Sequence, residues 1–140
     1  MKKILLLPAL AFSLVALAQA GDAVSIRKVL DEQIKEWNKG NIEGFMQGYW
    51  RSDSLMFIGK SGINWGWQKT LDNYRKNYPD TIAMGKLSYD IILVKELSPE
   101  YYYVVGKWML TRSIGNLGGH YNLLFRKING QWLIIADHSS

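Results

Sequence analysis

Two strands at the end of the sequence bring together residue types suited to acid–base chemistry. Asn129-Gly130 is flanked by alternating apolar residues, which predicts a β-hairpin closed by a two-residue turn. Counting outward from this turn places His138 opposite Tyr121 on one face of the hairpin. An imidazole titrates near neutral pH and a phenol donates a hydrogen bond, so this pair could exchange protons with a bound molecule.

The same register predicts which face of the hairpin is buried. The face with His138 and Tyr121 is expected inside, because its other cross-strand pairs are apolar. These pairs are Phe125 with Ile134 and Leu123 with Ala136. Asp137 is then expected to point away from any pocket. We interpret His138 as an acid or base that Tyr121 orients or assists, and the alternative is a structural histidine at a strand end.

Further residues are candidates for ligand contacts. In the strand expected near 101–112, the alternating set that contains Trp108 is assigned to the helix-covered face, so Arg112 lies on the side of Tyr121. A guanidinium suits a carboxylate or phosphate, and the alternative is an ordinary surface arginine. Five aromatic residues could line an apolar pocket or simply fill the core. They are Trp37, Tyr49, Trp67, Tyr74 and Trp108.

Composition excludes several kinds of site. The chain has no cysteine, which excludes disulfides, thiolate metal sites and cysteine nucleophiles. His120 and His138 are expected on opposite faces without a fixed acidic partner, so we expect no metal site, and nothing indicates a cofactor. Asp90 is expected outside the sheet unless its strand slips by one residue, which would bury the carboxylate. Periodicity therefore places no acid firmly inside.

Residues 1–20 have the features of a secretory signal peptide. Lys2-Lys3 precede an apolar run over residues 4–17 and the small-residue site Ala18-Gln19-Ala20. Cleavage would leave 140 − 20 = 120 residues, which we interpret as one periplasmic or secreted domain over 21–140. No later segment reaches the ~20 apolar residues of a membrane span, so no membrane insertion is expected after cleavage.

The charge of the chain does not favour a nucleic-acid partner. Of the 17 Lys and Arg residues, 15 remain when Lys2 and Lys3 are removed, against 12 Asp and Glu, a net charge of +3. These charges are spread along the chain without a basic run, whereas nucleic-acid binding usually needs a concentrated patch.

Hydrophobic periodicity predicts helices followed by a meander of strands. Apolar residues recur at helical spacing in three segments and alternate from residue 84 onward. The helices are expected over 22–39, 42–50 and 67–78, where Pro79 ends the last, and the strands near 55–58, 86–97, 101–112, 119–128 and 131–138. Short connections require antiparallel pairing in the meander, so we predict an α+β layer fold.

The outer face of the predicted sheet carries apolar residues that no remaining segment covers. They are Val105, Met109, Leu124, Leu133 and Ile135. Exposed apolar patches of this kind mark association, so we expect a homodimer through this face.

Several motifs resemble those of the nuclear transport factor 2-like superfamily, in its branch of SnoaL-like and ketosteroid isomerase-like domains. They are Trp37-Asn38-Lys39-Gly40-Asn41, Trp67 with Tyr74, Trp108, and Trp132-Leu133-Ile134 followed by Asp137-His138-Ser139-Ser140. The resemblance implies a cystatin-like cone in which a strongly curved antiparallel sheet wraps a long helix and leaves a cavity open at one end. Its members include cofactor-free isomerases, dehydratases and cyclases as well as proteins that only bind or dimerise.

Two functions from different classes therefore remain. The first is a small-molecule-binding domain that uses the cavity. The alternative is a cofactor-free acid–base enzyme, such as an isomerase, cyclase or dehydratase, with His138 in the cavity and Tyr121 and Arg112 as polar partners. We favour binding because periodicity places no carboxylate inside.

Overall fold

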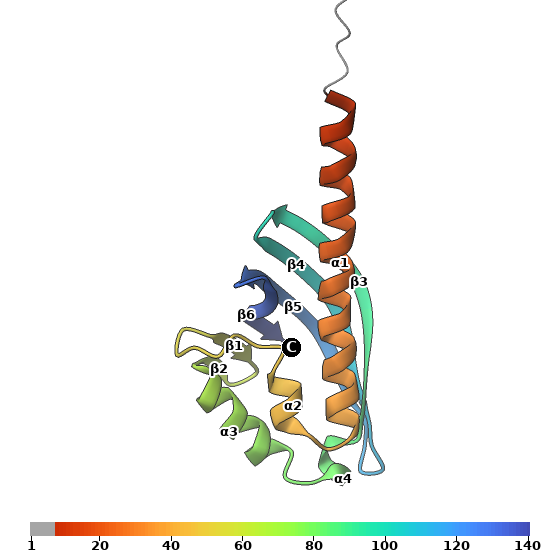
Figure 1. The fold of residues 1–140 in the computed structure, drawn as a ribbon. Coiled ribbons are helices and arrows are strands. Elements are labelled where there is room, and N and C mark those ends of the chain that lie inside the picture. The colour runs from red at the N-terminus through yellow and green to blue at the C-terminus, as the bar shows by residue number, and fades with distance from the viewer. Residues whose placement is uncertain (1–7) are drawn as a thin grey trace, which may run out of the picture.

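The protein, seen here in a computed structural model that describes residues 8–140, folds into helices laid against one curved sheet (Figure 1). The N-terminal half contains α1 (Pro8–Asn38), α2 (Ile42–Met46), β1 (Met56–Gly59), β2 (Gly62–Trp65), α3 (Trp67–Asn77) and α4 (Thr81–Met84). Four long strands follow, β3 (Lys86–Ser98), β4 (Tyr101–Thr111), β5 (Leu117–Ile128) and β6 (Gln131–Ser139). Residues 1–7 of the predicted signal peptide lie outside the described residues.

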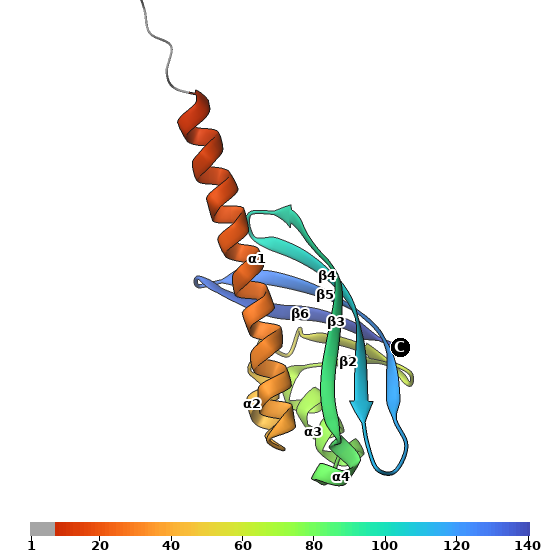
Figure 2. The same ribbon diagram turned by 90° about the vertical axis from the view of Figure 1, so that its right-hand side faces the viewer.

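The six strands form one open sheet in the order β2-β1-β6-β5-β4-β3. The predicted meander from β3 to β6 is antiparallel, and α1 crosses its inner face (Figure 2). The predicted α+β fold with N-terminal helices against a strongly curved sheet is confirmed. One pairing differs, because β1 lies parallel to β6. The connection between these two strands runs from residue 60 to residue 130, so the reasoning from short loops does not apply to it.

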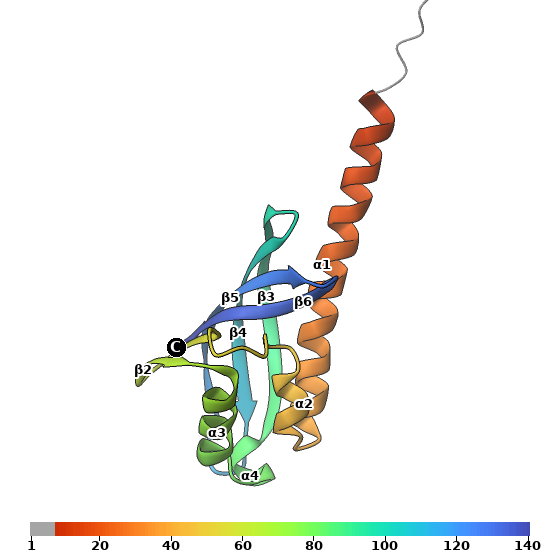
Figure 3. The ribbon, with the colours of Figure 1, turned by 60° about the vertical axis from the view of Figure 1, so that its left-hand side comes forward.

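Some segments depart from the predicted elements. The second helix ends at Met46 rather than near residue 50, because the following residues join the sheet. The Trp50 amide donates to the Ile134 carbonyl, and the Ile134 amide donates to the Gly48 carbonyl, both at 2.9 Å. The short elements β2 and α4 were not predicted. In Figure 3, α3 lies directly below β2 and next to α2.

Polar side chains fasten the end of α1 to the elements beside it. The Trp37 indole donates to the Met84 carbonyl at 3.2 Å. The Asn38 side chain accepts from the Leu87 backbone N–H at 2.7 Å and donates to the Leu87 backbone carbonyl at 3.1 Å. It therefore makes the two hydrogen bonds to β3 that a neighbouring strand residue would make. Asn41 accepts from the Gly44 amide at 3.0 Å and so caps α2. The motif over residues 37–41 thus connects α1 to α2 and β3 through hydrogen bonds.

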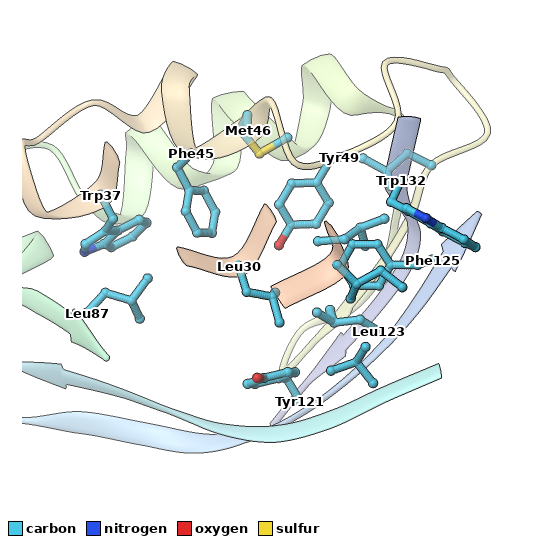
Figure 4. Packing of buried hydrophobic residues seen from close by; sticks show 14 of the residues in the cluster. Leu30, Trp37, Phe45, Met46, Tyr49, Leu87, Tyr121, Leu123, Phe125 and Trp132 are labelled. Carbon is cyan, nitrogen blue, oxygen red and sulfur yellow. The ribbon is translucent and has the colours of Figure 1, made fainter. Parts of the chain in front are cut away.

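The core lies between α1 and the sheet (Figure 4). Ile26 and Leu30 on α1 are fully buried against apolar residues of the strands. Burying one such side chain stabilises the folded state by about 1.5–3 kcal/mol. The buried residues from Ile26 to Ile134 form one continuous core.

Truncation of a core side chain on α1 should destabilise the protein far more than truncation of an exposed one. Leu30 is 0% exposed and Val24 is 66% exposed on the same helix. We expect Leu30→Ala to lower the free energy of unfolding by about 2–5 kcal/mol, since it leaves a cavity. Val24→Ala should change it by less than about 0.5 kcal/mol. Urea unfolding followed by circular dichroism measures both, and equal effects would contradict this core.

Candidate functional site

The pairing of β5 with β6 contains an irregularity that changes the predicted site. The register holds for the four pairs nearest the turn, whose residues Asn129 and Gly130 have the positive φ angles of the predicted turn. Ile135 is then an extra residue in β6, so Asn122 rather than Tyr121 lies opposite His138. Such a bulge reverses which residues point inward from that position onward.

The bulge overturns two predictions about the end of β6. Asp137 was expected outside, yet it is 4% exposed and faces the interior. His138 was expected opposite Tyr121, yet its side chain is exposed on the other face. The signal in the sequence was the run of four apolar residues over 133–136, which breaks the strict alternation of a regular half-buried strand.

Asp137 is held inside the protein by two hydroxyl groups. The Tyr49 hydroxyl donates to one carboxylate oxygen and the Ser139 hydroxyl donates to the other, both at 2.7 Å. Burial raises the pKa of Asp137 from its ordinary value of 3.8 to about 6, although the two hydrogen bonds and the nearby His138 lower it. The carboxyl group can therefore gain or lose a proton close to neutral pH.

This carboxylate lies in the wall of a cavity of about 860 Å³. The cavity is bounded mainly by α1, α3 and the inner faces of β3, β4 and β5. Its lining is rich in aromatic side chains, which are Trp37, Phe45, Tyr49, Phe57, Tyr74, Tyr78, Tyr89, Trp108 and Tyr121. In Figure 4, Tyr49 and Tyr121 approach the interior from opposite sides, with Leu30 near them.

Four of the five predicted aromatic candidates line the cavity. They are Trp37, Tyr49, Tyr74 and Trp108. Trp67 does not line it, because its ring is buried at the start of α3 and its indole donates to the Met46 carbonyl at 2.9 Å. The Arg51 guanidinium covers this ring at 4.7 Å from the centroid. Trp67 therefore joins α2 to α3 and leaves the cavity wall to Tyr74.

Two hydrogen-bond donors in the cavity wall have no partner within residues 8–140. They are the Tyr121 hydroxyl and the Trp108 indole nitrogen, both buried. Burial, with the charges of Asp137 and Asp90, raises the pKa of Tyr121 to about 12, so the phenol stays protonated. Buried donors are seldom left without an acceptor, which makes these two groups available to a ligand.

The exposed lining residues of the cavity lie on the β1–β2 turn, on α3 and at both ends of the β5–β6 hairpin. They are Lys60, Ser61, Lys76, Asn77, Leu117, Gly118 and Ser140. Asp137 is the only acidic side chain among the described residues that line the cavity. The exposed part of the lining thus carries two lysine side chains, whereas the buried part is aromatic with one side-chain carboxyl group.

The other predicted site residues lie apart from the cavity. The Arg112 guanidinium donates to the Ala83 carbonyl at 3.1 Å and to the Gly115 carbonyl at 2.7 Å, so it fastens α4 and the β4–β5 loop. Asp90 pairs across the sheet with Lys107 on the outer face, as in the first of the two registers considered. The structure therefore brings Tyr121 together with the aromatic residues, but neither His138 nor Arg112.

Two classes of feature are absent from residues 8–140. No group of three or more His, Asp or Glu side chains in this part of the chain is arranged to hold a metal ion. Among the described helices, none combines the length and the apolar character that crossing a membrane requires.

A solved structure decides the family. A nuclear transport factor 2-like protein of unknown function from Shewanella oneidensis is 39% identical, and the match covers 86% of this chain and 98% of that chain with a TM-score of 0.80. The chain belongs to the nuclear transport factor 2-like family. No protein-family profile and no curated protein matches it.

More distant structures share the fold of this nuclear transport factor 2-like domain. A ketosteroid isomerase-like protein from Erwinia carotovora is 17% identical, with 85% of this chain and 95% of that chain covered and a TM-score of 0.66. A domain of unknown function with a cystatin-like fold from Nostoc punctiforme is 16% identical, with 86% and 76% covered and a TM-score of 0.71. Their similarity supports the architecture and leaves the chemistry to the residues of the cavity.

The buried carboxyl group should make the stability of this domain depend on pH. The pKa of Asp137 is raised from 3.8 to about 6, so the folded state binds the proton more tightly than the unfolded state. Its contribution to stability is complete below pH 3.8 and is lost as pH rises through about 6, a change of roughly 3 kcal/mol.

Asp137→Asn should remove this pH dependence. The free energy of unfolding of the wild type, minus that of the variant, should fall between pH 4 and pH 7, as measured by urea titrations at each pH. Taking the difference cancels the pH-dependent contributions of the other carboxyl groups. One of them is Asp22, whose pKa burial raises but the hydrogen bonds from Lys127 and Trp132 lower by more. A difference that stays constant with pH would show that Asp137 titrates as an exposed acid.

Proposed function

We propose that this nuclear transport factor 2-like domain binds a small, largely apolar molecule in its aromatic cavity. The observation that carries the proposal is a cavity of about 860 Å³ that combines aromatic walls with a few inward-facing polar groups. Ligand pockets typically measure about 300–1,000 Å³ and have this mixture of apolar wall and few polar groups. These polar groups include Asp137, Tyr121 and Trp108.

A second candidate is proton transfer, and the buried Asp137 favours it. A carboxylate whose pKa lies near 6 is ionised at neutral pH yet basic enough to accept a proton from a substrate. The Tyr121 phenol could donate to the oxygen on which charge develops. Asp137 thus takes the role that the sequence suggested for His138. The structure of the ketosteroid isomerase-like protein from Erwinia carotovora agrees with this candidate through its fold alone.

Export from the cytoplasm is part of the proposal. Residues 16–21 are exposed, and burial begins with Asp22, which accepts from Lys127 at 2.9 Å and from the Trp132 indole at 3.0 Å. The first part of α1 extends beyond the sheet in Figure 1. These features support a domain that starts near residue 21 and a signal peptide that ends at Ala20.

We also propose that the outer face of the sheet forms a homodimer. Met109 is 46% exposed, and the other four residues of the predicted patch are only partly buried. Exposed apolar side chains on a sheet face are typical of association sites. The cavity lies on the opposite face, so a dimer of this type would leave its opening free.

Native mass spectrometry of the full chain, expressed in an exporting bacterium, tests ligand binding, processing and assembly together. We expect the mass of residues 21–140, a dimer, and an additional small apolar molecule per protomer. Asn73→Trp places bulk on α3 at the cavity wall and should remove the bound molecule. Gln68→Trp adds the same bulk on an exposed part of α3 and should retain it. Binding that survives Asn73→Trp would contradict this cavity as the site.

Proton transfer is tested by hydrogen exchange at a carbon next to a carbonyl. With 1-indanone in D₂O, we expect the wild type to accelerate exchange of the C2 hydrogens, as followed by NMR. Asp137→Asn should lower this rate about a hundredfold or more, the usual contribution of a general base. His138→Gln should leave it unchanged, because that side chain is outside the cavity. An equal loss in both variants would refute the assignment to Asp137.

A further inference from the structure

A second cavity lies at the end of the molecule where α1 stops. It measures about 500 Å³ and is bounded by the last residues of α1, by α4, by the start of β3 and by the end of β4. Figure 2 shows these four segments together at the lower end of the ribbon. Trp37 is the only described residue that lines both this cavity and the aromatic cavity. The two cavities are therefore separate sites on either side of one indole ring.

The charged residues that line this second cavity are all cationic, so we call it the basic cavity. They are Lys39, Lys86 and Arg112, and no Asp or Glu stands among the described residues of its lining. Lys39 pairs with Glu36 at 2.8 Å. Neither Lys86 nor Arg112 forms a salt bridge within residues 8–140. Two positive charges in the wall therefore lack a protein counterion in this part of the chain.

Backbone carbonyls hold both of these cations and leave part of their donor capacity unused. The Arg112 guanidinium donates through Nε to the Gly115 carbonyl at 2.7 Å and through Nη1 to the Ala83 carbonyl at 3.1 Å. Its Nη2 group has no acceptor within residues 8–140. The Lys86 ammonium donates to the Asn38 carbonyl at 2.7 Å. A guanidinium has five N–H donors and an ammonium three, so each group is positioned and can still bind an anion.

Two glycines allow the walls of the basic cavity to approach one another closely. Gly85 has a φ of 62°, and a Cβ atom there would collide with the Arg112 side chain and come within 2.5 Å of the Thr111 carbonyl oxygen. Gly40 has a φ of 82°, and a Cβ atom there would lie 3.1 Å from the Thr81 methyl group. Both φ angles favour glycine. The position of the guanidinium therefore depends on backbone packing and not on a flexible surface loop alone.

The remaining polar groups of the lining favour an oxyanion with several oxygens. Three hydroxyl groups line the basic cavity with the cations, those of Thr81, Thr111 and Ser113. A phosphate monoester carries a charge of about −1.5 to −2 at pH 7 and has three acceptor oxygens, which matches two uncompensated cations with neighbouring donors. The nearby Asp80 carboxylate is already bound to the Ala83 amide at 2.8 Å. A volume of about 500 Å³ also leaves room for an organic group on the phosphate.

We propose that the basic cavity binds the phosphate monoester group of a small polar molecule, with Arg112 and Lys86 as the cations that contact its oxygens. A free phosphate ester and the head group of a phospholipid share this chemistry. The site is independent of the ligand proposed for the aromatic cavity, because the lysines that line that cavity, Lys60 and Lys76, belong to other elements.

Calorimetry on the purified full chain tests the site with sn-glycerol 3-phosphate and with glycerol as the uncharged match. At constant ionic strength, we expect the phosphate ester to bind and glycerol not to bind. Lys86→Gln should weaken binding of the ester at least fivefold. Lys76→Gln removes a lysine from the aromatic cavity instead and should leave the affinity unchanged.

A charge-reversing pair of variants tests the same site without altering a cation. Ser113→Glu places a carboxylate in the exposed lining of the basic cavity and should weaken binding of the ester at least tenfold. Ser54→Glu adds the same charge at an exposed position outside both cavities and should have no effect. Arg112 also fastens α4, so the test relies on these surface variants, and thermal unfolding verifies that each is folded.

Vesicle sedimentation distinguishes the two sources of the phosphate. Phosphatidylcholine vesicles are prepared with phosphatidic acid, whose head group is a phosphate monoester, or with the same fraction of phosphatidylglycerol, which is a diester. A head-group ligand predicts stronger sedimentation with phosphatidic acid, and Ser113→Glu should abolish that preference. Binding of sn-glycerol 3-phosphate with no preference between the vesicles identifies a free ester as the ligand.

Three results would overturn the proposal. The first is that neither sn-glycerol 3-phosphate nor phosphatidic acid is preferred over its match. The second is an equal loss of binding in Lys86→Gln and Lys76→Gln, which would move the anion to the aromatic cavity. The third is binding that persists in both Lys86→Gln and Ser113→Glu. None of these results bears on the apolar ligand of the aromatic cavity, which Asn73→Trp tests separately.

Discussion

The extra residue at Ile135 in β6 is the constraint on which the chemistry of the cavity depends. Ile134 remains fully buried before the bulge, and Asp137 turns inward after it. A regular strand would instead have placed His138 inside and Asp137 outside. The same part of β6 also binds the segment that follows α2, because the Ile134 backbone forms hydrogen bonds with Gly48 and Trp50. Tyr49 lies between these two residues, so β6 positions both the carboxylate and the hydroxyl that donates to it.

Keeping Asp137 inside opposes folding whenever the group is charged. Burial raises its pKa to about 6, and two short hydrogen bonds from Tyr49 and Ser139 recover only part of the lost hydration. A fold selected for stability alone would place an apolar residue there. Perturbed carboxyl groups of this kind collect at binding and catalytic sites, and this one faces a cavity rather than a solid core.

The parts of the fold that depend on local pattern were predictable from the sequence. The four strands of the meander, the inward face of Trp108 and the turn at Asn129-Gly130 follow from alternation and turn chemistry. The inward position of Asp137 was not predictable from alternation, because one inserted residue reverses every later side chain. The helical stripe of α3 likewise identifies Trp67 and Tyr74 as inward-facing, yet only tertiary packing decides that Trp67 meets α2 while Tyr74 meets the cavity.

The polar groups of the cavity differ in charge and in pKa, and this difference can orient a ligand. Between about pH 6 and pH 12, the pKa values of Asp137 and Tyr121 leave a negative acceptor and a neutral donor in the same cavity. The Trp108 indole adds a donor that does not titrate. A molecule that carries an acceptor at one position and an acidic hydrogen at another can satisfy both groups in one orientation only. Binding and proton transfer therefore make the same geometric demand on the ligand, and the strength of Asp137 as a base decides which of them the cavity performs.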